Sequence, residues 1–286
     1  MDATAYLVFG DLHGRILPAF RLAAVWARES GVRVAALLQV GDLGWFPEPG
    51  KLDKATQRHA EKDSLELGAQ LLAQPCKLAD DIFADEHVAG GLWFTAGNHE
   101  DYDSLEFWEQ GAGAQADSFC VDAYCRVHCI RDGRAAELPG GLRVGALWGI
   151  DDAAPNARRK TLPRARIRAR SATQLAGADF DVLLMHESPR DAVYTDAGSS
   201  DISALIGLAQ PAFAYFGHYH TEQRQIEGPF GDTQVYHLAG MEMRGRDGFA
   251  EPGSVGVLTW HSDGGEFAYL EESWLRTFTR HNWRYR

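Results

Sequence analysis

Side chains that can bind divalent metal ions occur in five short clusters, most of them at the end of an apolar run. The seven candidate ligands are Asp11 and His13 in GDLHG, Asp42 in GDLG, Asn98 in GNHE, His186 in LLMHE, and His218 and His220 in GHYH. Oxygen and imidazole donors mixed in this way suit a pair of divalent transition metals. Two such ions a few ångströms apart can attack phosphate esters. The clusters therefore predict phosphoester hydrolysis and leave the substrate open.

Each cluster taken alone has an ordinary structural explanation. Asp42 follows a glycine, and aspartate and glycine are common turn residues. His186 could be a core histidine with a satisfied hydrogen bond. The ordered set is more specific, because five of the chain's eleven histidines fall in these clusters. We therefore interpret the clusters together as one metal site.

The bulk composition is that of an ordinary globular protein, with 286 residues, 45% hydrophobic and 24% charged. The formal net charge of −12 argues against broad adhesion to nucleic acid or to an anionic membrane. The sequence has neither a basic leader nor an apolar run long enough to span a membrane, so we expect a cytoplasmic protein without a membrane partner. Since clusters between residues 11 and 220 must meet, we expect one domain over 1–286, with insertions at about 45–90 and 101–180.

Four cysteines are expected to be free cytosolic thiols: Cys76, Cys120, Cys125 and Cys129. Three of them lie near His128 in CVDAYCRVHC. A zinc site there is the weaker alternative, because the close C-x2-C pair of a zinc knuckle is missing.

Hydrophobic periodicity predicts strands and helices that would position these clusters. Apolar runs predict strands at 5–10, 34–41, 92–97, 142–149, 181–187, 214–220, 233–240 and 254–261. Helices are expected at 17–28, 54–75 and 101–109. The pattern begins as alternating strands and helices and ends as successive strands, which indicates an α/β fold of two packed sheets with helices outside. The clusters would then lie just beyond the carboxyl ends of strands, where such sheets bind ligands.

The order GDxHG, GD, GNHE, single histidine and GHxH resembles the calcineurin-like metallophosphoesterase superfamily over about residues 10–220. The resemblance implies a four-layer α/β/β/α sandwich of two mixed sheets flanked by helices. It also implies that Asp11, His13 and His220 hold one ion. Asn98, His186 and His218 would hold the second, and Asp42 would bridge both. His99 would contact the phosphate or protonate the leaving oxygen.

A water shared by two metals has its pKa lowered from about 15.7 to near neutrality, so a bridging hydroxide is the expected nucleophile. Imidazole exchanges protons near pH 7, which suits His99 as a general acid. Manganese is the first expectation for the two ions, with iron or zinc as alternatives, because the same ligands accept all three.

Two residues are candidate substrate contacts. Arg15 could direct a positive charge toward the phosphate, or lie on the surface. Trp45 stands where serine/threonine protein phosphatases, whose motif reads GDxxDRG, have an aspartate that orients the catalytic histidine. That branch is disfavoured, and His99 needs another partner, such as Glu100. Trp45 and Phe46 would either stack on a base or aromatic leaving group, or pack into the core.

Residues 158–170 carry seven basic residues and no acid. They either guide a polyanionic substrate or are exposed charges paired with the acidic surface. The six C-terminal residues, 281–286, mix aromatic and basic side chains, and tails of this length are often disordered.

We weigh three functions for the chain. The first is a phosphodiesterase acting on nucleotides or nucleic acid, since AGNHED and LLMHESP also resemble the lariat-debranching and nucleotide phosphodiesterase branches. The second is a phosphomonoesterase acting on a small metabolite or phosphoprotein. The third is a non-catalytic scaffold, which is disfavoured because all seven ligands are retained. The sequence does not choose a protein partner or an oligomeric state.

Overall fold

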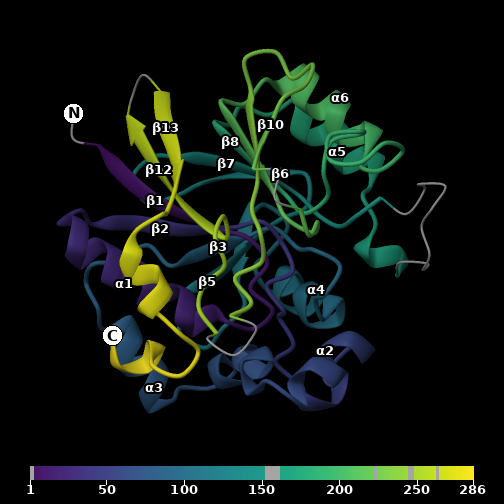
Figure 1. Ribbon diagram of the computed structural model, residues 1–286. Coiled ribbons are helices and arrows are strands. Elements are labelled where there is room, and N and C mark those ends of the chain that lie inside the picture. Colours follow the sequence, from purple (N-terminus) through teal and green to yellow (C-terminus); the bar gives the residue numbers. More distant parts are fainter. Residues whose placement is uncertain (1–2, 152–161, 222–223, 244–247, 262–263) are drawn as a thin grey trace.

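Two mixed β-sheets pack face to face, and helices cover their outer faces (Figure 1). The structure is a computed structural model that describes residues 3–151, 162–221, 224–243, 248–261 and 264–286. Helices α5 and α6 cover one outer face, and α1 and α3 lie on the opposite side (Figure 1). The predicted four-layer α/β/β/α sandwich is therefore confirmed. The expected single-domain organisation stays a prediction.

The first sheet has the strand order β13-β12-β1-β2-β3-β5-β4. Strands β1, β2, β3 and β5 run parallel, and β12, β13 and β4 add antiparallel edges. The bounds are β1 (Thr4–Phe9), β2 (Val34–Gln39), β3 (Leu92–Phe94), β4 (Ser118–Cys120), β5 (Val127–Ile130), β12 (Val255–His261) and β13 (Gly264–Tyr269).

The second sheet has the order β10-β11-β9-β8-β7-β6. Its four middle strands are parallel, and each edge strand is antiparallel to its neighbour. The bounds are β6 (Arg134–Glu137), β7 (Arg143–Leu147), β8 (Val182–Met185), β9 (Phe213–Phe216), β10 (Gln225–Ile226) and β11 (Gln234–His237).

The helices are short apart from α1. They are α1 (Ile16–Ser30), α2 (Lys54–Ala60), α3 (Lys77–Phe83), α4 (Tyr102–Gly111), α5 (Ala169–Ala176) and α6 (Ser200–Ala209), with 3-10 helices η1 (Pro49–Lys51), η2 (Ser64–Leu72), η3 (Pro163–Ala165), η4 (Ser273–Thr277) and η5 (Trp283–Tyr285). Helix α1 ends where Gly31 adopts the left-handed conformation with φ 72°, as its position in the sequence predicts. Among the described residues, no helix has the length and apolar character needed to cross a membrane.

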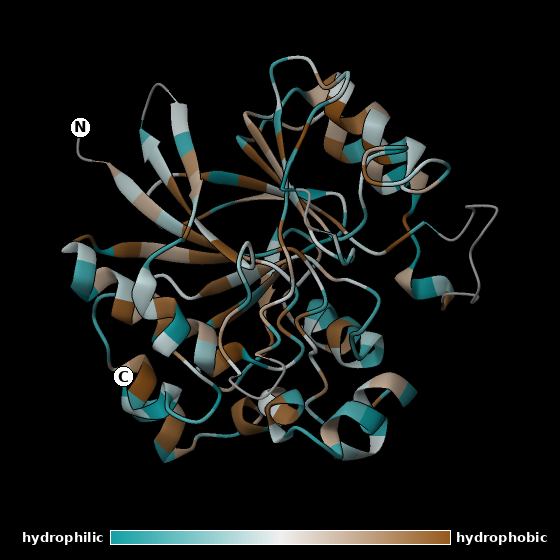
Figure 2. Ribbon diagram, viewed as in Figure 1, coloured by the Kyte–Doolittle hydropathy of each residue, from teal (hydrophilic) through white to brown (hydrophobic). Residues whose placement is uncertain are grey.

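The strands alternate between two apolar layers. In β1, Tyr6 and Val8 face the second sheet, whereas Leu7 and Phe9 pack with α1. Figure 2 shows hydrophobic residues along the strands of both sheets. Because β1 and β2 are covered on both faces, each contains a run of five hydrophobic residues, 5–9 in β1 and 34–38 in β2.

The helical segment predicted at 54–75 is divided into two helices, of which the second is a 3-10 helix. Helix α2 ends at Ala60, and the 3-10 helix η2 begins after Asp63, whose carboxylate accepts a hydrogen bond from the N–H of Leu65. Gly68 lies so close to the Gly14 carbonyl that an added Cβ would be 1.8 Å from its oxygen. This close contact fixes the path of η2 against the start of α1.

Arg15 is buried beneath this segment, with 1% of its surface exposed. Its guanidinium lies 2.7 Å from Asp63 Oδ2 and 2.8 Å from Glu66 Oε1. The structure therefore contradicts both expectations for Arg15, because the charge is neither at the surface nor directed at a phosphate. Asp63 also accepts from Arg280 at 2.8 Å, which ties in the C-terminal segment. Trp283 is buried, so the expectation of a disordered tail is wrong.

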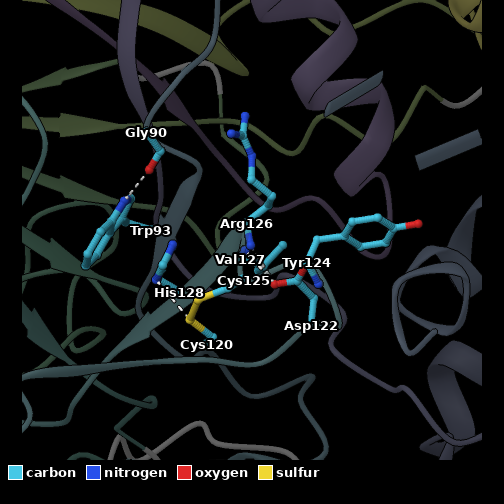
Figure 3. Close-up of a disulfide and its surroundings, with 9 residues drawn as sticks. All are labelled: Gly90, Trp93, Cys120, Asp122, Tyr124, Cys125, Arg126, Val127 and His128. Carbon is cyan, nitrogen blue, oxygen red and sulfur yellow. Dashed lines mark hydrogen bonds between the residues drawn. A yellow bond between two sulfur atoms is a disulfide. The ribbon is translucent and has the colours of Figure 1, made fainter. Parts of the chain in front are cut away.

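The cysteine prediction needs one correction. Cys120 and Cys125 form a disulfide (Figure 3). Cys76 and Cys129 are free thiols. The two half-cystines flank a tight turn that brings their Cα atoms to 5.0 Å, a spacing at which cysteines can pair.

The basic segment lies partly outside the described residues, which resume at residue 162. Arg164 pairs with Asp103 and Glu106 of α4, and Arg168 lies 3.6 Å from Asp132. Arg164 and Arg168 therefore agree with the expectation that charges of this segment pair with acidic residues.

We expect Arg15→Met to lower the free energy of unfolding by about 3–5 kcal/mol, because it removes the cation paired with the buried Glu66 and leaves Asp63 with Arg280 alone. Arg28→Met is the matched control, since the half-exposed Arg28 pairs with Asp85 at the surface. Its loss should cost at most about 1 kcal/mol. Urea unfolding of both variants measures the difference. Equal, small effects would show that Arg15 does not anchor the segment.

Candidate metal centre

The predicted ligand clusters lie together at one edge of the two sheets. They follow the carboxyl ends of β1, β2 and β3 in the first sheet and of β8 and β9 in the second. The loops meet around a cavity of about 230 Å³. Six of the seven predicted ligands line it together with His99: Asp11, His13, Asp42, Asn98, His218 and His220. The seventh ligand, His186, is fully buried next to Asp42.

Two groups of donor atoms share one carboxylate. The first group is Asp11, His13 and Asp42, and the second is Asp42, His186 and His218. Within each group, the candidate ligand atoms lie within 4.8 Å of one another. This arrangement agrees with the sequence-based assignment of Asp42 to both ions.

His220 and Glu242 complete the rim of the cavity. His220 is exposed and lies outside both groups of close donors, so its ligand role stays a prediction. Glu242 was missed by the sequence analysis, although it is buried and its Oε1 is 3.9 Å from His13 Nε2. It follows β11 in a segment without a recognisable motif, and only the fold brings it to the cavity.

The Asp42 side chain is fixed by the loop after β3. Its Oδ1 accepts hydrogen bonds from the N–H groups of Asn98 at 2.7 Å and His99 at 2.8 Å. Gly97 permits this contact, because an added Cβ would lie 2.2 Å from the same oxygen. The glycine of GNHE therefore serves to bring the backbone against the shared carboxylate.

Three predicted ligands adopt a backbone conformation that side chains disfavour. The φ angles of His13, Asp42 and His218 are 42°, 53° and 68°. Such residues cost about 1–3 kcal/mol each and gather at functional sites, where the surrounding structure holds them in place. Their concentration here supports a functional role for the cluster.

Burial and charge set the protonation of the site. Burial lowers the pKa of both His13 and His218 to about 3, so each imidazole is neutral and able to bind a metal. Burial opposes ionisation of Asp42, but His186 and the other histidines hold its pKa well below the usual value. Burial would lower the pKa of His186, but Asp42 and Asp11 raise it to about 10. The buried carboxylates thus attract positive charge.

The donor set fits a pair of divalent ions. Asn98 Oδ1 is buried and has no hydrogen-bond partner among the described residues. A buried polar atom left unpaired costs about 1–3 kcal/mol, which a bound cation would offset. His186 Nε2 is also buried and lies 3.3 Å from Asp42 Oδ2. Both atoms belong to the predicted second metal site.

His99 has a partner that the sequence analysis did not find. Its Nδ1 lies 2.5 Å from Asp53 Oδ2, while Asp53 Oδ1 caps α2 through the N–H groups of Ala55 and Thr56. Burial would lower the pKa of His99, but Asp42 and Asp53 raise it to about 9. The only signal for this contact in the sequence is an aspartate directly before the start of the predicted helix at 54–75.

Glu100 has a different role from the one expected. Its two carboxylate oxygens accept from Leu43 N at 2.8 Å and Trp45 N at 2.7 Å, so it holds the turn after Asp42. Trp45 is fully buried in the core and does not line the cavity. The structure therefore contradicts the expectation that Trp45 contacts the substrate.

Solved structures share this architecture. The Thermus thermophilus protein TT1561 aligns with a TM-score of 0.51 and 13% identity, over 94% of this chain and 99% of that one. A second structure aligns over the same shares with a TM-score of 0.53 and 15% identity. The chain therefore shares its fold with both structures over nearly their whole length. The predicted architecture of two mixed sheets flanked by helices is confirmed at the level of fold.

A further solved structure is less similar. A 5′-nucleotidase from Candida albicans SC5314 aligns at 12% identity with a TM-score of 0.45, over 99% of this chain and 53% of that one. No family model and no curated protein matches the chain by sequence.

We expect Asp53→Ser to lower kcat about tenfold or more with unchanged metal content, because serine still caps α2 but no longer contacts His99. The matched control is Asp101→Ser, since Asp101 caps α4 in the same way.

His99→Ala should lower kcat by a factor of about 10²–10⁴ while both ions remain bound. Loss of metal from His99→Ala, or an equal loss of kcat in the Asp101 control, would contradict these roles.

Proposed function

We propose that the chain is a metal-dependent phosphodiesterase that hydrolyses nucleotide-type diesters with two divalent ions, of which manganese is the first candidate. The observation that carries this proposal is the pair of donor groups joined by Asp42. Site one would use Asp11, His13 and His220, with Glu242 nearby. Site two would use Asn98, His186 and His218. Oxygen and nitrogen donors of this kind accept manganese, iron or zinc.

The bound ions would neutralise the phosphate oxygens and lower the pKa of water, so that hydroxide forms near neutral pH. The chain's own residues would complete the reaction. His99 lines the cavity, and the hydrogen bond between its Nδ1 and Asp53 favours the protonated imidazole. Asp53 holds Nδ1, which leaves Nε2 as the atom that can donate a proton to the leaving oxygen.

A diester requires room for a substituent on each side of the phosphate. The cavity is lined in part by Ala55, Thr56 and His59 from α2. His220 and Glu242 line both this cavity and a neighbouring recess of about 250 Å³. The adjoining recess offers space for a second substituent, which supports a diester over a monoester.

The charges around the cavity favour a small substrate over a long nucleic acid. Among the described residues, neither lysine nor arginine lines the cavity or the adjoining recess. Glu242 and Glu251 lie along that recess and would repel further phosphates. We therefore narrow the substrate to nucleotides or similar small diesters. A cytoplasmic location without a membrane partner remains part of the proposal.

A substrate panel tests this function. Manganese-loaded protein should hydrolyse bis(p-nitrophenyl) phosphate with a kcat/KM about tenfold above that for p-nitrophenyl phosphate, a difference of ~1.4 kcal/mol in transition-state stabilisation. Cyclic nucleotides and short RNA and DNA complete the panel, and we expect the nucleotides to outperform the oligomers. A preference for monoesters throughout would contradict the proposed phosphodiesterase activity and favour a phosphomonoesterase. The absence of turnover with every substrate and metal would favour the non-catalytic scaffold.

A further inference from the structure

A second cluster of metal-binding side chains lies at the edge of the first sheet, separate from the candidate metal centre. Cys120 ends β4, His128 lies in β5, and Cys125 lies in the turn between them (Figure 3). The three side chains place candidate ligand atoms within 4.8 Å of one another, and Cys120 Sγ is 3.6 Å from His128 Nδ1. Two sulfurs and one imidazole are the donor types of zinc sites.

Backbone interactions, in addition to the disulfide, hold this cluster together. Cys120 and His128 are directly opposite each other in the antiparallel pairing of β4 with β5. The turn between them is held by Asp122, which accepts from Val127 N at 2.8 Å, Arg126 N at 2.9 Å and Tyr124 N at 3.0 Å (Figure 3). These backbone interactions would keep the two sulfurs beside the imidazole after reduction.

His128 is oriented for ligation. Its ring stacks on Trp93 with centroids 4.3 Å apart and an interplanar angle of 11°. Trp93 is itself anchored through Nε1 to the Gly90 carbonyl at 2.8 Å. Burial also lowers the pKa of His128, which favours the neutral imidazole that binds metals.

We propose that Cys120, Cys125 and His128 form a redox-controlled site that binds a thiophilic divalent ion such as zinc when the disulfide is reduced. Two thiolates and His128 Nδ1 would supply three ligands, and a water or an external ligand the fourth. Thiolates prefer zinc to manganese, so this site would select a different ion from the metal centre. The bound ion would hold β4 and β5 together at the edge of the first sheet. Strand β5 pairs with β3, which leads to Asn98 and His99.

The redox step needs an external dithiol as reductant. A thiolate of that dithiol attacks the sulfur of Cys125, which is the exposed member of the pair, and Cys120 leaves as a thiolate. The second thiol of the reductant then displaces Cys125 and closes the reductant's own disulfide. Two electrons and two protons pass to the protein, and the two protons are released again when the ion binds both sulfurs.

Cobalt(II) is the probe that separates this site from the metal centre. Thiolate-bound cobalt gives a near-ultraviolet charge-transfer band, whereas the oxygen and nitrogen donors of the metal centre do not. The full chain is reduced with a phosphine, which is removed before cobalt is added. We expect one equivalent of thiolate-bound cobalt, and we expect oxidised glutathione to abolish the band by restoring the disulfide.

Single variants assign the ligands. Cys120→Ser and Cys125→Ser should each lose the band, and Cys129→Ser is the matched control that should keep it, because the buried Cys129 lies outside the cluster. Circular dichroism checks that each variant folds. If Cys120→Ser does not fold, Cys125→Ser still tests the proposal, because Cys125 is exposed. Absence of the band in the reduced wild type, or its survival in Cys125→Ser, would overturn the proposal.

Discussion

Asp42 makes the contacts that hold the loops of both sheets together at the candidate metal centre. One carboxylate oxygen accepts two N–H groups from the loop after β3, and the other lies 3.3 Å from His186 Nε2 in the loop after β8. The Asp42 carbonyl accepts from the N–H groups of Leu12 and His13 in the loop after β1, each at 3.0 Å. One residue therefore connects three loops from two sheets, and a displaced Asp42 would disturb both groups of donors.

The packing around Asp42 explains why its neighbours are small or strained. Gly41 and Gly97 both lie where a Cβ would collide, the first with His186 and the second with Asp42 itself. The left-handed backbone of Asp42 is held by Glu100 and by the paired loops, since Glu100 binds the N–H groups that follow it. A rigid support of this kind keeps ligands in position before an ion binds, which is what preorganised metal sites require.

The sequence predicts those features that repeat a local pattern. The first five residues of β2 are apolar, and Gly41 and Asp42 follow shortly after the strand, so both the buried strand and the place of Asp42 near its end could be inferred. Asp53, Glu242 and Arg15 could not, because their roles depend on segments that meet only in three dimensions. A buried arginine such as Arg15 has the same local sequence signal as an exposed one, and its two carboxylate partners lie about fifty residues away. The same holds for Trp45, whose burial reflects packing that no motif encodes.

The central claim is that two ions share Asp42, and an anomalous-scattering crystal structure of the manganese-loaded protein tests it most directly. The account predicts two anomalous peaks a few ångströms apart, each within bonding distance of one Asp42 oxygen. His13 and Asp11 should contact one peak, and Asn98, His186 and His218 the other. A single peak, or two peaks of which neither contacts Asp42, would contradict it.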